Sequence, residues 1–320
     1  MTSDDIVKEV HDAEGRIRPH IRRTRIIKST VDGSRLTHPL FLKLENEQHT
    51  GSFKARGSLN KVLSLNTNER AKGVITASTG NHGMGVARAL QLTGVEGTVF
   101  LPRTASKLKI EKLESLGAKL KYVEGSPLDT ELHAKHLAQV SGSNWISPYN
   151  DRKIIGGQGT IAIEILEQMP KVKRVFITVG GGGMVSGIAS VLKHTHPGVK
   201  IVGCVPENSP EMYLSVQAGH IVHLDEDKET LSDGSAGGAE DDSITFPLCA
   251  DLIDDWVLVS EQEIADAMRA VYREHDMIIE GSAGVAVAAS LKYGEESGQD
   301  LAVICGGNVD MDRFQEIVRD

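Results

Sequence analysis

The chain has 320 residues, of which 40% are hydrophobic, 25% charged and 4% aromatic, a composition typical of a globular protein with one large domain or two smaller ones. Its net charge of −9, with no run of Lys and Arg, argues against nucleic-acid binding, which requires a basic surface. No apolar segment approaches the roughly 20 residues that a membrane-spanning helix needs.

Short apolar segments alternate with longer amphipathic segments along the chain. The apolar segments are predicted to be strands, and several are apolar on both faces, as buried parallel strands are. In chain order the predicted strands are 40–44, 73–76, 97–100, 119–123, 174–179, 200–205 and 301–305. The predicted helices between them are 55–63, 82–92, 106–116, 128–140, 159–168, 184–192, 261–274 and 282–293. This alternation predicts an α/β fold in which helices cover both faces of mostly parallel sheets.

The domain organisation follows from the segment between two glycine-bearing turns, which contains a complete series of strands and helices. We expect residues 73–148 to form a small inserted α/β domain. The large domain would then be discontinuous and consist of residues 1–72 and 149–320.

The three cysteines, Cys204, Cys249 and Cys305, are widely spaced and lack the CxxC pattern of a zinc or redox site. The first residues also lack the basic and apolar regions of a secretory signal. We therefore expect a cytoplasmic protein whose thiols stay reduced.

One lysine, Lys54, lies between a turn of small residues and the predicted start of a helix, in the sequence GSFKARG. A lysine held in this way can form a Schiff base with a carbonyl compound. A solvated surface charge is the alternative that the motif leaves open when it is considered alone.

Four successive glycines, Gly180, Gly181, Gly182 and Gly183, follow a predicted strand and precede a predicted helix. Backbone N–H groups without neighbouring Cβ atoms can approach an anion closely, and a helix N-terminus favours negative charge. The turn therefore predicts a phosphate-binding site. It has neither the GxGxxG spacing of a dinucleotide fold nor the Gly-Lys-Ser/Thr of a P-loop. A purely structural turn remains the alternative.

Three further segments carry polar or small side chains next to predicted secondary structure. The first, STGNHG at residues 78–83, offers hydroxyls, the Asn81 amide and backbone N–H groups to a carboxylate, with an ordinary helix cap by Ser78 or Thr79 as the alternative. The second is EGSAG, where Glu280 precedes a predicted helix and a cap-region charge is the alternative. The third is CGGN, where Cys305 ends the last predicted strand.

These motifs, in this order and spacing, resemble those of the fold-type II pyridoxal-phosphate enzymes, and among them the serine/threonine dehydratases (ammonia-lyases) and the related serine racemases. The resemblance extends from residue 17 to Asp310. It implies a tryptophan synthase β-like fold, with two open, mostly parallel twisted sheets flanked by helices. It also implies pyridoxal 5′-phosphate as cofactor, an amino acid as substrate and a homodimer. The implied reaction is α,β-elimination of L-serine and/or L-threonine to a 2-oxo acid and ammonia.

The resemblance implies a role for each motif residue in holding the cofactor. Lys54 would bind it as a Schiff base and, once freed, remove the Cα proton of the substrate. Phe53 would pack against the cofactor ring, and Asn81 would hydrogen-bond its 3′-oxygen. Its phosphate would be bound by Gly180, Gly181, Gly182, Gly183 and the N–H group of Met184.

The resemblance also implies which residues bind the substrate and which residue faces the ring nitrogen of the cofactor. The substrate carboxylate would be bound by Ser78, Thr79, Asn81 and His82. Glu280 corresponds to an acidic residue near the cofactor. Cys305 would face the pyridine nitrogen, where most relatives have serine. Because a neutral thiol does not protonate this nitrogen as a carboxylic acid does, the ring is a weaker electron sink, which favours loss of a β-leaving group over transamination.

Two other activities stay open within this resemblance. Serine racemases use a serine hydroxyl as a second acid or base, and Thr79 has the matching position, so racemisation with side elimination is the first alternative. The glycine-rich segment 230–240 is similar to that of the dehydratases of hydroxyectoine breakdown. A larger substrate, such as 3-hydroxyaspartate or a hydroxyectoine-derived amino acid, is therefore the second.

Related racemases bind a divalent cation through residues that match Glu207, Glu211 and Tyr213. Tyr213 replaces a carboxylate, which makes the set poor for magnesium. A monovalent ion or calcium could still be held by Glu207 and the backbone carbonyl of Glu211.

Overall fold

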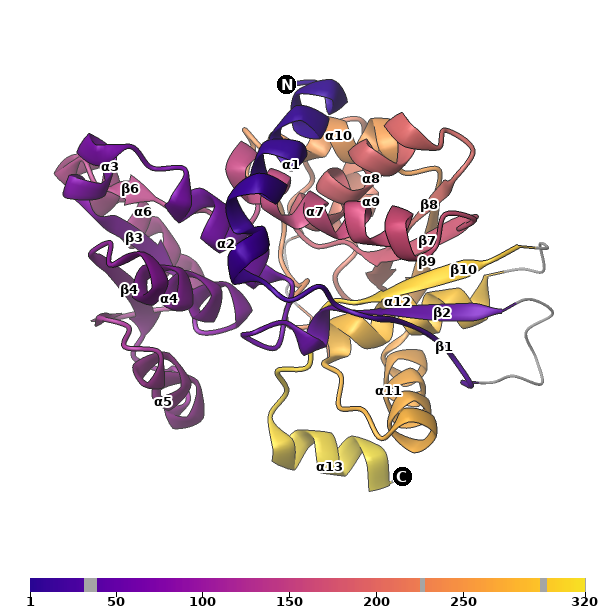
Figure 1. Cartoon of the computed structure of the whole chain (residues 1–320). Helices are drawn as coiled ribbons and strands as arrows, with labels where there is room; N and C mark the ends of the chain where they lie inside the picture. Colours follow the sequence, from indigo (N-terminus) through magenta and orange to yellow (C-terminus); the bar gives the residue numbers. More distant parts are fainter. Residues whose placement is uncertain (32–38, 225–227, 294–297, 320) are drawn as a thin grey trace.

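The computed structural model describes residues 1–31, 39–224, 228–293 and 298–319. Their strands form two separate sheets, each flanked by helices (Figure 1). This is the α/β architecture that the alternation of strands and helices predicts.

The larger sheet has the strand order β1-β2-β10-β7-β8-β9. All neighbouring pairs are parallel except β1 and β2, which are antiparallel. The strands are β1 (Ile26–Lys28), β2 (Leu40–Leu44), β7 (Arg174–Thr178), β8 (Lys200–Pro206), β9 (Asp255–Val259) and β10 (Asp300–Ile304). Every residue of β7 and β10 is buried, because helices cover both faces of the sheet, as usual for parallel sheets.

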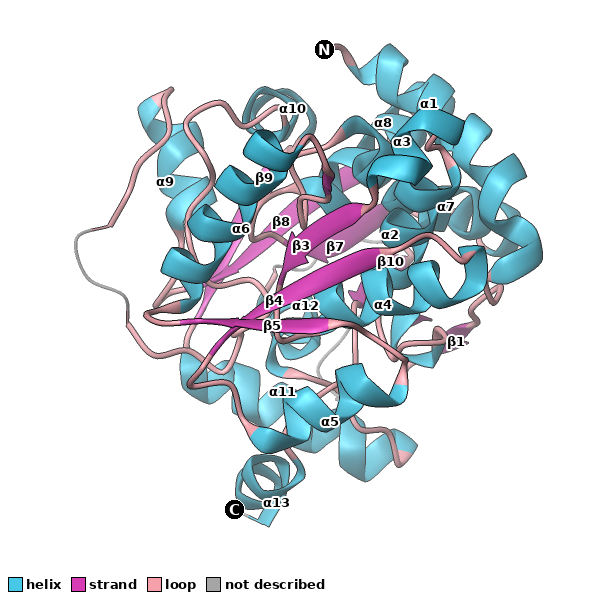
Figure 2. Cartoon of the chain, turned by 90° about the vertical axis from the view of Figure 1, so that its left-hand side faces the viewer, coloured by secondary structure: helices cyan, strands magenta, loops and turns pink. Residues whose placement is uncertain are grey.

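The smaller sheet has the order β5-β4-β3-β6, and all its pairs are parallel (Figure 2). Its strands are β3 (Val74–Ala77), β4 (Gly97–Pro102), β5 (Leu120–Val123) and β6 (Asn144–Trp145). The whole sheet thus lies inside the proposed inserted domain, residues 73–148. The domain boundaries themselves remain a prediction.

Helices α1, α7 and α8 pack against one another on one side of the larger sheet, and α11, α12 and α13 lie on the other (Figure 1). Helix α2 connects the half of the molecule around the larger sheet with the half around the smaller sheet, because it packs on both α4 and α7. The α-helices are α1 (Ser3–Ile17), α2 (Lys54–Leu63), α3 (Thr67–Lys72), α4 (Asn81–Thr93), α5 (Lys107–Ser115), α6 (Pro127–Ser141), α7 (Arg152–Gln168), α8 (Gly183–Thr195), α9 (Glu211–Ala218), α10 (Thr245–Leu252), α11 (Glu261–His275), α12 (Gly281–Lys292) and α13 (Met311–Arg319).

The predicted start of the helix 159–168 is wrong, since α7 begins at Arg152, where Asp151 caps it. The glycines in its first turns argue against a helix on propensity, but close packing requires them. A Cβ atom on Gly156 would lie 2.4 Å from Glu9 Cγ, and one on Gly157 would lie 2.5 Å from Gly57 Cα.

The prediction also missed β1, β6 and β9, and the helices α1, α3, α9, α10 and α13. Strands β1 and β6 have three and two residues, too short for a periodic pattern. Of the helices in the described residues, none is both long and apolar enough to cross a membrane.

Candidate active site

A cavity of about 1220 Å³ is lined by residues from both halves of the molecule. Its walls include the segments that follow β3, β7 and β10, so that the carboxyl ends of parallel strands point at it, as in many α/β enzymes. It brings together nearly all the residues that the sequence analysis singled out: Phe53, Lys54, Ser78, Thr79, Asn81, His82, Gly180, Gly181, Gly182, Gly183, Met184, Glu211, Glu280 and Cys305. Glu207 is not part of this lining.

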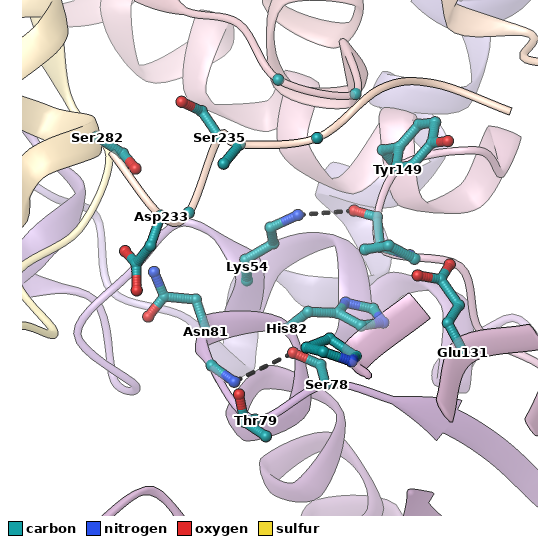
Figure 3. Close-up of a pocket in the computed structure, with 18 of the residues that line it drawn as sticks. Lys54, Ser78, Thr79, Asn81, His82, Glu131, Tyr149, Asp233, Ser235 and Ser282 are labelled. Atoms are coloured by element: carbon teal, nitrogen blue, oxygen red, sulfur yellow. Dashed lines mark hydrogen bonds between the residues drawn. The ribbon is translucent and has the colours of Figure 1, made fainter. Parts of the chain in front are cut away.

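Lys54 is the first residue of α2 and points into the cavity (Figure 3). The backbone before it is held by β10, because Phe53 N–H donates to the Cys305 carbonyl at 3.0 Å. The Lys54 amine donates to the Pro148 carbonyl at 2.8 Å and lies 5.2 Å from the centre of the Phe53 ring. Burial lowers the pKa of Lys54 to about 8, although the neighbouring Cys305, Glu280 and Glu131 act to raise it. The neutral, nucleophilic amine is thus accessible near neutral pH.

The glycine turn places three backbone N–H groups beside the start of α8. In the described part of the chain, the N–H groups of Gly180, Gly181 and Gly182 donate to no acceptor. Gly182 has φ +81°, a left-handed conformation that favours glycine. A Cβ atom on Gly181 would lie 2.4 Å from the Tyr149 ring. Glycine is therefore required here by packing as well as by backbone conformation.

Asn81 is oriented by a network of hydrogen bonds around Glu280. Its amide nitrogen donates to both Glu280 carboxylate oxygens at 2.9 Å, and its amide oxygen accepts from Asn308 at 2.8 Å. Asn308 also donates its backbone N–H to Glu280 at 3.1 Å. Glu280 is the N-cap residue of α12, but its side chain makes no cap hydrogen bond and its carboxylate is directed to Asn81 and Asn308 instead.

Two groups in this network stay protonated more readily than in water. Burial raises the pKa of Glu280 to about 7, although its hydrogen bond from Asn81 opposes the shift. Burial also raises the pKa of the Cys305 thiol well above its usual range. The Cys305 sulfur lies 3.8 Å from Glu280 Oε1, to which it donates. Cys305 is therefore a neutral thiol at physiological pH, as the sequence analysis assumed.

Ser78 and Thr79 lie on the loop between β3 and α4, partly exposed to the cavity. The N-cap residue of α4 is Gly80, and no side chain caps the helix, so the alternative of a simple serine or threonine cap is wrong. Instead, the Ser78 hydroxyl accepts from the Gly80 N–H at 3.2 Å. The start of α4 thus presents backbone N–H groups and hydroxyls to the cavity.

His82, on the first turn of α4, is only 4% exposed. Its Nε2 atom lies 3.1 Å from the Ile146 carbonyl and 3.0 Å from the Thr76 hydroxyl, whereas its Nδ1 atom is buried without a partner among the described residues. Because the Ile146 carbonyl can only accept, Nε2 carries the proton and Nδ1 is a free acceptor. Burial, together with the Lys54 charge, lowers the pKa of His82 to about 3, so the ring is neutral.

The residues of the predicted cation site are only partly brought together. The Glu207 carboxylate is half-exposed and lies 3.9 Å from the Lys292 amine. The Glu211 carbonyl accepts from the Ser215 hydroxyl at 2.7 Å within α9. In the ranges that the structure describes, no group of three or more His, Cys, Asp or Glu residues could hold a metal. The cation site therefore stays a prediction.

Several residues that line the cavity escaped the sequence analysis. Asn308 stood in the CGGN motif without a role, although it holds both Asn81 and Glu280. Ser282 in the EGSAG motif and Ser235 in the segment 230–240 also stood without a role. Glu131 and Tyr149 lie in no motif, so that no sequence signal distinguished them.

The site fits pyridoxal phosphate, the cofactor that the resemblance implies. A nucleophilic amine at Lys54 can bond to an aldehyde, and the N–H groups of the glycine turn beside a helix N-terminus can bind a phosphate. Asn81 supplies an oriented amide, and Cys305 supplies a neutral hydrogen-bonding group.

Comparison with known proteins supports this fit. A family model described as pyridoxal-phosphate dependent enzyme matches residues 17–306. The chain is 38% identical over 314 residues to the L-threonine ammonia-lyase of Thermotoga maritima, covering 98% of this chain and 78% of that protein. It is 36% identical over 316 residues to a catabolic L-threonine dehydratase of Staphylococcus aureus, covering 97% and 91%.

Solved structures give the same result. The processed form of threonine deaminase isoform 2 from Solanum lycopersicum superposes with a TM-score of 0.93 at 32% identity, covering 100% of this chain and 94% of that one. Maize serine racemase superposes with a TM-score of 0.91 at 32% identity, covering 97% and 95%. The chain therefore belongs to the family of pyridoxal-phosphate dependent enzymes, with the two-sheet fold of its structural relatives.

Proposed function

We propose that this protein is a pyridoxal-phosphate dependent ammonia-lyase that converts L-threonine, L-serine or both into a 2-oxo acid and ammonia. The observation that carries the proposal is the amine of Lys54, which lies in the cavity with a lowered pKa and with a backbone carbonyl, not a carboxylate, as its hydrogen-bond acceptor. The similarity to an L-threonine ammonia-lyase and an L-threonine dehydratase supports this choice of substrate.

The cofactor would be held by Lys54 through its amine, by Gly180, Gly181, Gly182, Gly183 and Met184 around its phosphate, and by Phe53 and Asn81 at its ring. When bound, pyridoxal phosphate acts as an electron sink that makes the Cα hydrogen of an amino acid acidic. The neutral thiol of Cys305 would not protonate the ring nitrogen, and this would favour prompt loss of the β-hydroxyl.

The residues of the chain would move the proton and bind the substrate. Lys54 Nζ, with its pKa of about 8, is suited to accept the Cα proton near neutral pH. The hydroxyls of Ser78 and Thr79, with the backbone N–H groups at the start of α4, would bind the substrate carboxylate, since a helix N-terminus favours an anion. His82 would contribute its backbone only, because Nδ1 is an acceptor.

The test is to incubate the purified holoenzyme with L-threonine and L-serine and to measure 2-oxo acid and ammonia in equal amounts. The same assay with Lys54→Ala, after cofactor loading, is the control for catalysis by free cofactor. Absence of 2-oxo acid from both substrates, in a protein that binds the cofactor, would reject the proposal.

Racemisation is the second candidate, because the Thr79 hydroxyl is partly exposed to the cavity and a serine racemase is a structural relative. Thr79 would deliver a proton to the face of Cα opposite Lys54. Chiral chromatography of the L-serine reaction would detect D-serine, and Thr79→Val would abolish it while Thr79→Ser retained it.

The assembly and setting are proposed by analogy with the family. We propose a homodimer in the cytoplasm, with a cation held near Glu207 and the Glu211 carbonyl. Light scattering of the purified protein measures its mass, and activity after dialysis against chelator, with K⁺ or Ca²⁺ added back, tests the cation.

A further inference from the structure

The cavity contains a carboxylate that the proposed reaction does not use. Glu131 lies on α6 and lines the cavity, and Figure 3 shows its carboxylate pointing inward, on the same side as the His82 ring. Among the described residues, its side chain forms no hydrogen bond and no ion pair. Burial raises the pKa of Glu131, and so does the nearby Glu240.

The obvious partner for Glu131 is bound elsewhere. Lys135 stands four residues further along α6, on the same face of the helix, where Glu and Lys commonly pair. Its amine instead donates to Glu240 at 2.8 Å, and Asn150 also donates to that carboxylate. The other cation that acts on Glu131 is Lys54, which the cofactor would engage. Glu131 is therefore left to interact with what enters the cavity.

A second acceptor in the cavity wall, His82 Nδ1, is closed off from the cavity space. His82 Nδ1 is buried, carries no proton and has no donor among the described residues. The Glu131 carboxylate is half-buried and has no donor among the described residues, so it is complementary to a group with several N–H bonds and a positive charge.

The cavity also has room for more than threonine. Its volume of about 1220 Å³ has to hold the cofactor as well as the substrate, and it exceeds the roughly 300–1,000 Å³ of typical ligand sites. Apolar side chains flank Glu131 on α6, where Leu128 and Leu132 line the cavity, and Leu108 faces it from α5. A short methylene chain could therefore pass between them.

We propose that the preferred substrate is a β-hydroxy amino acid with a cationic amine at the end of its side chain, and that Glu131 binds this amine. This inference rests on the elimination reaction of the proposed function, and it extends the substrates of that reaction beyond threonine and serine to one further class. It also disfavours anionic substrates such as 3-hydroxyaspartate, since like charges repel at the Glu131 carboxylate.

The test compares 3-hydroxyornithine with 3-hydroxynorvaline, which has the same carbon chain without the terminal amine. We expect the holoenzyme to release ammonia from the cationic substrate with the higher kcat/KM. Glu131→Gln should reduce this preference by about 10- to 100-fold, the usual value of a hydrogen bond between charged groups. Glu114→Gln, which removes an exposed carboxylate on α5, should leave it unchanged. Equal preference in the parent and Glu131→Gln enzymes would overturn the proposal.

A binding measurement separates this inference from the proposed function. L-ornithine and L-norvaline have no β-hydroxyl, so that they bind without elimination, and the absorbance of the cofactor reports their Kd. Tighter binding of ornithine that is lost in Glu131→Gln supports the inference. It does so even if no substrate yields ammonia, although the absence of ammonia would reject the proposed ammonia-lyase activity. Equal Kd values for the two ligands would reject the inference even if threonine is a good substrate.

Discussion

The first turn of α2 carries two cations in opposite surroundings. Arg56 is fully buried beneath the helix, where it donates two hydrogen bonds to Glu45, both at 2.7 Å, and one to Glu164 at 2.9 Å. Burial by itself would lower the pKa of Arg56, but the two carboxylates raise it above its usual value. Lys54, two residues earlier, has the Pro148 carbonyl as its acceptor, and its pKa falls to about 8.

The difference between the two side chains distinguishes a charge that stabilises the fold, Arg56, from an amine that can react, Lys54. A buried cation with carboxylate partners is locked in its charged form, and here it ties α2 to α7 and to Glu45, the residue that follows β2. A cation without such a partner can lose its proton and react. The same contrast holds for acids, since Glu164 is paired with Arg56 and Lys43 and its pKa falls to about 2. Glu131, by contrast, has no ion-pair partner in the described part of the chain, and its pKa rises.

Replacing Lys54 by methionine should give the largest effect. We expect 2-oxo acid formation to fall at least about 1,000-fold, because the variant lacks both the amine that bonds the cofactor and the base that accepts the Cα proton. The rate is measured with saturating cofactor. Lys72→Met, at an exposed position on α3, is the matched control. A variant that kept more than a tenth of the activity would contradict the role of Lys54.

Replacing Arg56 by methionine should instead act on stability. The change leaves Glu45 buried with the Thr24 hydroxyl, 2.6 Å away, as its remaining side-chain donor, and we expect the free energy of unfolding in urea to fall by about 3–5 kcal/mol. The double variant Arg56→Met/Glu45→Gln should recover part of this loss. An unchanged free energy of unfolding in the single variant would show that the network is not structural.

In the cofactor-free protein, Lys54→Met should raise the free energy of unfolding, whereas Arg56→Met should lower it. Because the pKa of Lys54 falls to about 8 on folding, the charged amine costs stability below pH 8, on the order of 3 kcal/mol at pH 7. Methionine removes that cost. The difference in free energy of unfolding between Lys54→Met and the parent protein should shrink as the pH rises from about 8 to about 10.5, where the unfolded chain also loses the proton. A pH-independent difference in urea unfolding would contradict the shifted pKa.

The two regions also differ in how far the sequence predicts them. Lys54, Asn81 and the glycine turn lie in short motifs that require those residue types, and the structure brings them to one cavity. The ion pairs of Arg56 with Glu45 and Glu164 could not be predicted in the same way. Glu164 is 108 residues from Arg56 in the sequence, and Arg56, Glu45 and Glu164 each have the pattern of an ordinary surface charge until helices pack over them.

Glu131 was missed for a related physical reason. On an amphipathic helix, a glutamate four residues before a lysine predicts a solvated ion pair. The pairing of Lys135 with Glu240 depends on the segment 230–240, which folds across α6 from a distant part of the chain. The start of α7 was missed because helix propensity opposes its glycines, whereas tertiary packing requires them.

The smallest expected effect tests whether the glycine turn, rather than the lysine, carries the affinity for the phosphate. A methyl group at Gly181 would meet the Tyr149 ring and displace the turn, so Gly181→Ala should weaken cofactor binding by about 10-fold, which corresponds to about 1.4 kcal/mol. Gly198→Ala, where nothing lies within 4 Å of the added methyl, is the matched control. The Kd for the cofactor is best measured in the Lys54→Met background, in which no covalent bond contributes. If Gly181→Ala left that Kd unchanged, the free N–H groups of the turn would have a different ligand, and affinity for the cofactor would have to come from Asn81 and the ring contacts alone.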